Sequence, residues 1–229
     1  MRPARDTLIT GRIAYRGGDG TALGEERFEL CHHAGGHTLR ATCELDDIGL
    51  LREVSMTMDA HWHPLDAFSR IIRGGRLTAT NWFSVDRGTV RVESRVAGAG
   101  RVSQHFDQTP PITYIGLHPL QGDALITTQV PRAHRGGYHS VRALTNSVAE
   151  SGDQGLYAVP VSIDVACLGE EALEVAAGTF TAEKFALRWS PDWPPAHLWV
   201  RRGSALFLKL TWSQISNWYE LVELHEDGP

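Results

Sequence analysis

The chain has 229 residues, of which 42% are hydrophobic and 21% are charged, so it is long enough to form a full core and too apolar to be disordered. Its formal net charge of -5 argues against a nucleic-acid partner, because phosphate binding relies on a clustered excess of Lys and Arg. No segment approaches the roughly 20 apolar residues of a membrane-spanning helix, so we expect no integral membrane insertion of that kind.

The first half of the chain repeats short runs of alternating apolar and polar residues, each ending in a turn that contains glycine. Glycine accepts the positive φ angles of tight hairpin turns, so this pattern predicts consecutive antiparallel strands. The strands expected in this half are 7–16, 21–32, 37–46, 50–61, 65–73, 76–86, 89–97 and 101–106.

A proline-rich segment interrupts the pattern at 109–123, where Pro110, Pro111 and Pro119 remove backbone donors and a loop or short helix is expected. The strands expected after it are 125–130, 138–147, 156–168, 171–176, 179–190, 197–202, 205–212 and 217–225. So many antiparallel strands with few helices predict an all-β fold, a single lipocalin-like antiparallel β-barrel or deep half-barrel. We expect residues 1–229 to form one domain, as is common for barrels of this size.

The segment Val175-Ala176-Ala177-Gly178-Thr179-Phe180, followed by Leu198-Trp199-Val200 and the apolar strand at 205–212, resembles the C-terminal signature of an uncharacterised bacterial family. That family consists of antiparallel proteins related in shape to lipocalins and to lipoprotein-carrier half-barrels. The resemblance is best between Val175 and Trp212. It implies an open or closed barrel around an apolar cavity, and the family supplies no catalytic residues to carry over.

The segment from Met1 to Asp6 is charged and runs directly into a predicted strand. Because it contains no apolar stretch of signal-peptide length, we expect a cytoplasmic location. The three cysteines, Cys31, Cys43 and Cys167, are odd in number and lack C-x-x-C spacing. We therefore expect buried thiols in a reducing compartment.

Histidines gather in two places before the proline-rich segment. Asp59, His61 and His63 would share one face of a strand. Two such residues could bind one metal ion, but a third ligand two residues further along the strand would lie too far away, so we expect no metal site. For His61 and His63 we entertain a position in the cavity lining, with a solvated outer face as the alternative. The Cys31-His32-His33 run with His37 lies at a hairpin tip, where a solvated loop is expected.

The proline-rich segment carries the candidate catalytic residues. Loops that a rigid scaffold positions often carry function, and this one brings Tyr114, His118 and Asp123 within ten residues. His118 is the natural general acid or base, because the ordinary pKa of histidine lies near neutrality, and Asp123 could orient its ring. The alternative is that both residues only cap the ends of local structure.

Three further residues are candidates for substrate binding. Trp82 offers a large amphipathic surface for a binding cavity. Tyr138 and His139 follow the segment His134-Arg135-Gly136-Gly137 and could bind the polar end of a ligand at the barrel mouth, although the glycines could simply form a turn.

No G-x-S-x-G, P-loop or His-Glu-x-x-His sequence occurs, so no cofactor is expected. We favour a cofactor-independent enzyme of the isomerase, hydratase/dehydratase or cyclase type, acting on a hydrophobic, cyclic or terpenoid-like molecule by His and Asp acid–base chemistry. The alternative is a non-catalytic intracellular carrier of a lipophilic ligand. An open sheet edge could be covered by a loop or by a second subunit, which would make a homodimer.

Overall fold

Alternation of side chains sets one face of each strand against the core. In β4 every second side chain from Leu50 to Met58 is buried. The computed structural model describes residues 7–133 and 135–227, and its first eight strands agree closely with the predicted ones. They are β1 (Thr7–Arg16), β2 (Ala22–His33), β3 (Gly36–Leu45), β4 (Leu50–Asp59), β5 (Pro64–Arg73), β6 (Arg76–Asp86), β7 (Thr89–Val96) and β8 (Gly100–Asp107).

The second half contains the helices and the most strongly bent strands. Its elements are β9 (Tyr114–Gly116), α1 (Leu120–Leu125), a 3-10 helix (Ile126–Gln129), β10 (Tyr138–Thr145), β11 (Val159–Val175), β12 (Gly178–Arg188), β13 (Ala196–Arg201), β14 (Phe207–Trp212) and β15 (Asn217–Asp227).

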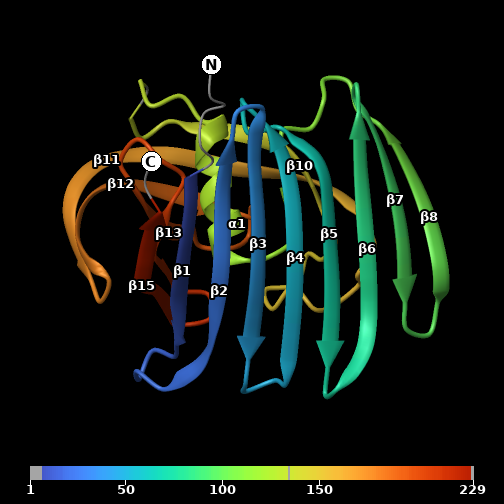
Figure 1. The fold of residues 1–229 in the computed structure, drawn as a ribbon, viewed down its shortest axis with the longest axis horizontal. Helices are drawn as coiled ribbons and strands as arrows, with labels where there is room; N and C mark the ends of the chain where they lie inside the picture. The colour runs from blue at the N-terminus through green and yellow to red at the C-terminus, as the bar shows by residue number, and fades with distance from the viewer. Residues whose placement is uncertain (1–6, 134, 228–229) are drawn as a thin grey trace.

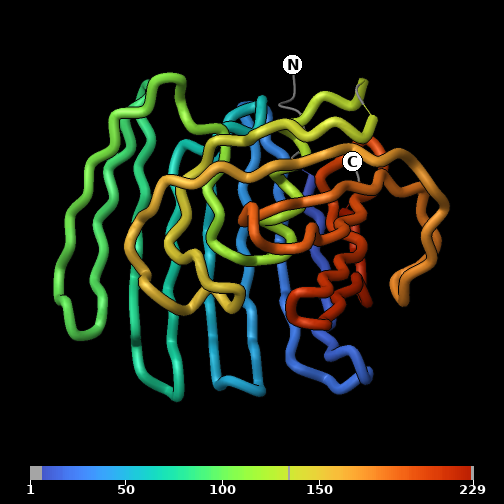
Figure 2. The backbone as a smooth tube through the Cα atoms, turned by 180° about the vertical axis from the view of Figure 1, so that it is seen from behind, coloured from blue at the N-terminus to red at the C-terminus, as the bar shows by residue number. Residues whose placement is uncertain are grey.

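All described strands belong to one 15-stranded sheet in the order β8-β7-β6-β5-β4-β3-β2-β1-β15-β14-β13-β12-β11-β10-β9. The sheet does not close, because its two edges, β8 and β9, do not pair with each other. The all-β prediction is therefore confirmed, and of its two forms the sheet takes the open one. Strands β1 to β8 stand side by side, β11 and β12 cross behind them, and α1 lies between the two layers (Figures 1 and 2). One pair departs from the antiparallel prediction, because β9 runs parallel to β10.

The predicted strand at 125–130 is wrong, since α1 and the 3-10 helix occupy this segment. The β-branched residues there favour a strand, but the hydroxyls of Thr127 and Thr128 bond back to the carbonyls of Ala124 and Leu125, each at 2.7 Å. The side chain of Gln121 also holds the helix, donating to the carbonyl of Ala205 and accepting from the amide of Phe207. Tertiary contacts thus override local β propensity.

The predicted strands at 156–168 and 171–176 are one strand, β11, because the expected break is a β-bulge. The register against β12 shifts between Cys167 and Gly169, and Gly169 has a φ of +136°. A bulge bends a strand without ending it, which lets β11 curve behind the first layer.

A buried amide network joins the segment after β10 to the inner face of the first layer. Asn146 donates to Ser69 and to Asn81, both at 3.1 Å, and Asn81 donates to the carbonyl of Leu156 at 2.9 Å. Because these side chains are buried, the bonds fix where the returning chain crosses the sheet.

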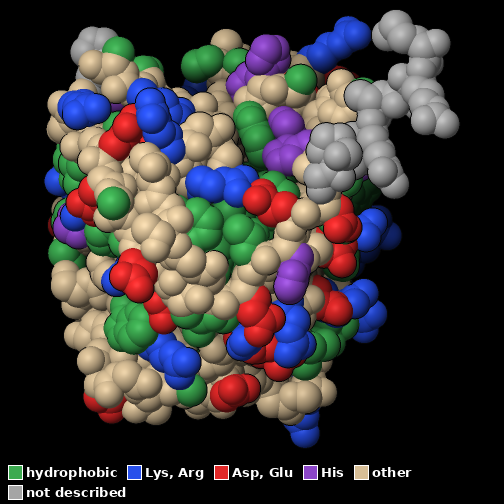
Figure 3. Space-filling view, turned by 60° about the vertical axis from the view of Figure 1, so that its left-hand side comes forward, with side chains coloured by type: hydrophobic (Ala, Val, Ile, Leu, Met, Phe, Trp, Pro, Cys, Tyr) green, Lys and Arg blue, Asp and Glu red, His purple; other side chains and the backbone are tan. Residues whose placement is uncertain are grey.

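Two surface observations bear on partners. No helix in the described part of the chain is long and apolar enough to cross a membrane. On the flank that carries β13 to β15, acidic and basic side chains lie interspersed (Figure 3).

Candidate functional site

A cavity of about 690 Å³ lies between the two layers and collects side chains from both. Tyr15 and Arg52 come from the first layer, Trp212 and Tyr219 from the last strands, and His118 from the proline-rich segment. The predicted catalytic residues Tyr114 and Asp123 line the same cavity as His118, so the structure brings all three together.

Tryptophans form one wall of this cavity. The ring centroid of Trp212 lies 4.9 Å from that of Trp189 and 5.3 Å from that of Trp193, and the Trp212 indole donates to the carbonyl of Pro194 at 2.9 Å. Rings packed in tilted and edge-on geometry give a large apolar surface with little freedom to rearrange. These rings therefore give the cavity a firm apolar wall.

The buried carboxylate of Glu26 holds the start of α1 against the sheet. It accepts from the amides of Leu120 at 2.6 Å and Gln121 at 2.9 Å, and from the hydroxyl of Tyr15 at 2.9 Å. Burial raises the pKa of Glu26, and the hydrogen bonds from Gln121, Leu120 and Tyr15 oppose that rise. Glu26 thus satisfies amides that the short helix leaves free.

Arg52 holds the residues just before α1. Its guanidinium donates to the carbonyl of His118 at 3.2 Å and to that of Ser151 at 2.7 Å, and the residue is 2% exposed. In the cross-strand register Cys43 lies between Glu26 and Arg52. The two buried charges therefore clamp both sides of Pro119, and we call Glu26 and Arg52 the charged clamp.

His118 is held neutral by this environment. Its φ is 69°, a left-handed conformation, and its Nε2 lies 3.1 Å from the carbonyl of Ser147. A carbonyl can only accept, so in the neutral ring Nε2 carries the proton. Burial, reinforced by the charge of Arg52, lowers the pKa of His118 to about 3.

Asp123 is a carboxyl that lines the cavity beside Tyr114. The hydroxyl of Tyr114 donates to its Oδ1 at 3.1 Å and also approaches the carbonyl of Gly122 at 3.3 Å. Burial raises the pKa of Asp123 to about 7, against a lowering contribution from the Tyr114 hydrogen bond. Burial also raises the pKa of Tyr114 well above 10, so its hydroxyl stays a donor.

His61 and His63 do not line the cavity, which overturns our hypothesis for them. Strand β4 ends at Asp59, whose Oδ1 accepts from the amides of His61 at 2.8 Å and His63 at 2.9 Å. This side chain closes a turn in place of further strand, and both histidines are exposed in it.

The other predicted substrate-binding residues also lie outside the cavity lining. Trp82 on β6 is 50% exposed, because the neighbouring Phe83 takes the buried face of the strand. Tyr138 is 40% exposed beneath the guanidinium of Arg188, and His139 is half-buried on β10. His134, from the same segment, lies outside the described residues.

Two of the three cysteines are buried, and the histidines of the hairpin tip contact one another. Cys43 and Cys167 are buried free thiols, whereas Cys31 is only half-buried. At the hairpin tip the Nδ1 atoms of His32 and His37 lie 2.8 Å apart, and His37 stacks on Trp62. Among the described residues, no group of three or more His, Cys, Asp or Glu side chains is placed to hold a metal ion.

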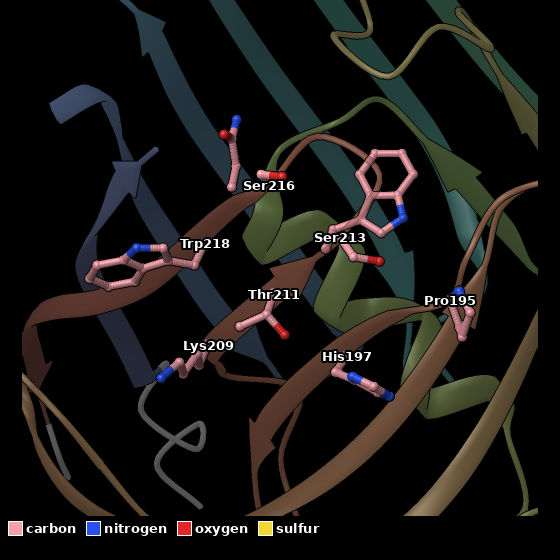
Figure 4. A pocket seen from close by; sticks show the side chains of 9 residues that line it. Pro195, His197, Lys209, Thr211, Ser213, Ser216 and Trp218 are labelled. Carbon is pink, nitrogen blue, oxygen red and sulfur yellow. The ribbon is translucent and has the colours of Figure 1, made fainter. Parts of the chain in front are cut away.

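A second hollow of about 580 Å³ lies at the end of strands β13 to β15. His197, Lys209, Thr211 and Trp218 contribute to it, as the close view shows (Figure 4). None of the predicted site residues belongs to it. The cavity between the layers is therefore the candidate site.

The charged clamp and the tryptophan wall were not predicted from the sequence. A signal for the clamp exists: Glu26 occupies the same strand face as Phe28 and Leu30, and Arg52 lies between Leu50 and Val54 on the buried face of β4. A charged residue in the apolar register of a strand indicates a buried, partnered charge. For the wall the local signal is only partial: Trp189 and Trp193 lie four residues apart in the loop between β12 and β13, whereas Trp212 comes from β14.

Comparison with known proteins identifies the fold alone. No family model matches the chain, and no curated protein matches it. It is similar to the structure of a β-barrel-like protein of the domain of unknown function DUF1849 from Brucella abortus, with 11% identity, 99% of each chain covered and a TM-score of 0.60. A DUF1089 family protein from Pseudomonas aeruginosa is similar over 83% of this chain and 90% of its own, with 13% identity and a TM-score of 0.52. The chain thus shares its fold with uncharacterised bacterial β-barrel-like proteins.

Proposed function

We propose that the protein is an acid–base enzyme that isomerises, hydrates, dehydrates or cyclises a hydrophobic, ring-containing molecule in the cavity between its layers. One observation carries the proposal: the carboxyl of Asp123, with a pKa of about 7, opens into an apolar cavity beside the Tyr114 hydroxyl. A carboxyl that titrates near neutrality in a pocket is suited to proton transfer.

Asp123 takes the proton-transfer role that the sequence suggested for His118. Near pH 7 the Asp123 carboxyl is present in both forms, so it can give a proton to a substrate and recover one from a neighbouring position. The hydroxyl of Tyr114 stabilises the ionised form by donating to Oδ1. His118, with a pKa of about 3, is too weak a base at neutral pH, and its neutral ring holds the carbonyl of Ser147.

The carrier remains the second candidate, and one observation favours it. Several polar groups around the cavity are committed to partners within the protein, as the bonds of His118 Nε2 and of the two terminal nitrogens of Arg52 to backbone carbonyls illustrate. A cavity with satisfied polar groups and an apolar wall is suited to holding a lipophilic molecule unchanged. Such a role would agree with the likeness to lipocalins and lipoprotein carriers that the C-terminal residues suggest.

Mass spectrometry of a lipophilic extract of the host, incubated with the protein, separates the two candidates. For the enzyme we expect one compound to be replaced by an isomer or by a product that differs by one water. Asp123→Asn should bind that compound and convert it at least about 100-fold more slowly, the usual contribution of a positioned acid or base. A compound retained unchanged by both proteins would favour the carrier, and conversion by Asp123→Asn at the original rate would refute the role of Asp123.

The tryptophan wall gives a separate prediction about binding. Trp193→Ala should weaken binding of the neutral fluorescent probe N-phenyl-1-naphthylamine by about tenfold, because an aromatic contact of that kind is worth roughly 1–2 kcal/mol. Trp82→Ala is the matched control, since Trp82 is exposed on β6 and should leave the affinity unchanged. Equal effects of the two substitutions would place the probe elsewhere.

A further inference from the structure

Strand β8 presents a free edge of the sheet. Within the described residues β8 pairs only with β7, and it forms the outer margin of the first layer (Figure 1). An edge strand exposes a row of backbone donors and acceptors that another strand can pair with. At the opposite end of the sheet, the edge strand β9 is only three residues long.

The backbone groups that point away from β7 can be assigned. The amide of Gln108 donates to the carbonyl of Gly88, and the β7–β8 register runs without a shift. Hydrogen-bonded and non-hydrogen-bonded pairs alternate along an antiparallel ladder, so the even-numbered residues of β8 bond to β7. The odd-numbered residues therefore direct their N–H and C=O groups outward, namely Arg101, Ser103, His105 and Asp107.

The side chains of β8 are complementary to those of a second β8 in the opposite direction. With Gln104 facing Gln104 on a twofold axis, Arg101 lies opposite Asp107 and Val102 lies opposite Phe106. Pairs of opposite charge and pairs of apolar side chains both stabilise directly opposed positions. The two charged residues lie on the exposed face, and the two apolar residues lie on the half-buried face.

This arrangement depends on one register. Centring the pair on Ser103 would set Arg101 opposite His105, and centring it on His105 would set Gln104 opposite Phe106, so neither neighbouring register keeps both favourable pairs. A register that sets odd-numbered residues opposite even-numbered ones is also excluded, because only the odd-numbered residues of each strand direct N–H and C=O groups toward the other. The existing partners of the charged residues, Glu93 for Arg101 and His105 for Asp107, make exposed contacts that leave the charges available.

We infer that two copies of this chain associate through antiparallel pairing of their β8 edges, centred on Gln104. The sheet then continues from one copy into the other, and the free edge is covered. This isologous contact closes on itself, so it yields a dimer and no longer assembly through this edge. We take the partner to be a second copy because β8 contains both members of each complementary pair, Arg101 with Asp107 and Val102 with Phe106.

Sedimentation of the purified full chain across a concentration series tests the dimer. Arg101→Glu alone and Asp107→Arg alone should each raise the dimer dissociation constant about tenfold, because each creates like-charged pairs across the axis. The double variant Arg101→Glu with Asp107→Arg restores opposite charges and should recover the original constant. Ser103→Pro should abolish dimerisation, since it removes an outward N–H and leaves the β7 ladder intact.

Circular dichroism of each variant establishes that it is folded before its assembly state is compared. A wild-type chain that stays monomeric across the series would overturn the inference, as would a dimer that survives Ser103→Pro. Failure of the double variant to recover association would overturn the Gln104-centred register. If the wild-type chain stays monomeric, the edge is left to a strand of another protein and the inference is wrong.

Discussion

Replacing Arg52 by Met should lower the free energy of unfolding by about 3–5 kcal/mol, the usual consequence of removing one member of a buried charged set. The substitution leaves the carbonyls of His118 and Ser151 without the donor that ties them to β4. Urea unfolding followed by fluorescence and circular dichroism measures the change, provided that both probes report one transition.

Arg70→Met is the matched control for Arg52→Met. Arg70 on β5 pairs with Glu53, the residue next to Arg52 on β4, at 2.5 Å, but both side chains are exposed. An exposed pair of this kind contributes about 0–1 kcal/mol. If the two substitutions reduced stability equally, the charged clamp would be no more than a surface pair, and it could not be what holds the proline-rich segment in place.

The first eight strands could be predicted because each depends on local information. A tight turn such as Arg73-Gly74-Gly75 and the alternation on either side of it specify a hairpin without reference to distant residues. The segment 125–130 could not be predicted in this way. Its helical form depends on Gln121 bonding to Ala205 and Phe207, which lie about eighty residues further along the chain.

The residues of the candidate site that belong to the proline-rich segment were predicted from the sequence, whereas those that belong to strands were missed. Tyr114, His118 and Asp123 belong to one irregular segment, so their proximity in sequence brings them to one cavity. On a strand the inward face must be known first, and in β6 aromatic residues occupy both faces, with Phe83 inside and Trp82 outside. Glu26 and Arg52 break the rule that charges face outward, and the backbone groups that stabilise them lie far away in sequence.

Asp123 and His118 should give the folded protein opposite dependences of stability on pH. The pKa of Asp123 rises from 3.8 to about 7 on folding, so the folded state holds an extra proton between these values and stability falls as pH rises through them. The pKa of His118 falls from 6.5 to about 3, so the folded state holds fewer protons and stability rises with pH up to 6.5. Between about pH 4 and 6.5 the two contributions cancel.

Single substitutions should reveal the two opposite dependences of the free energy of unfolding on pH that cancel in the wild type. Relative to the wild type, Asp123→Asn should gain about 3 kcal/mol of stability between pH 4 and 6.5, at about 1.4 kcal/mol for each pKa unit. His118→Gln, which keeps a donor for the Ser147 carbonyl, should lose a similar amount over the same range. Urea unfolding at a series of pH values measures both differences, and all other titrating groups drop out of the comparison. A flat difference for Asp123→Asn would mean that its carboxyl titrates at an ordinary acidic pH, which would leave the cavity without a group poised for proton transfer and favour the carrier.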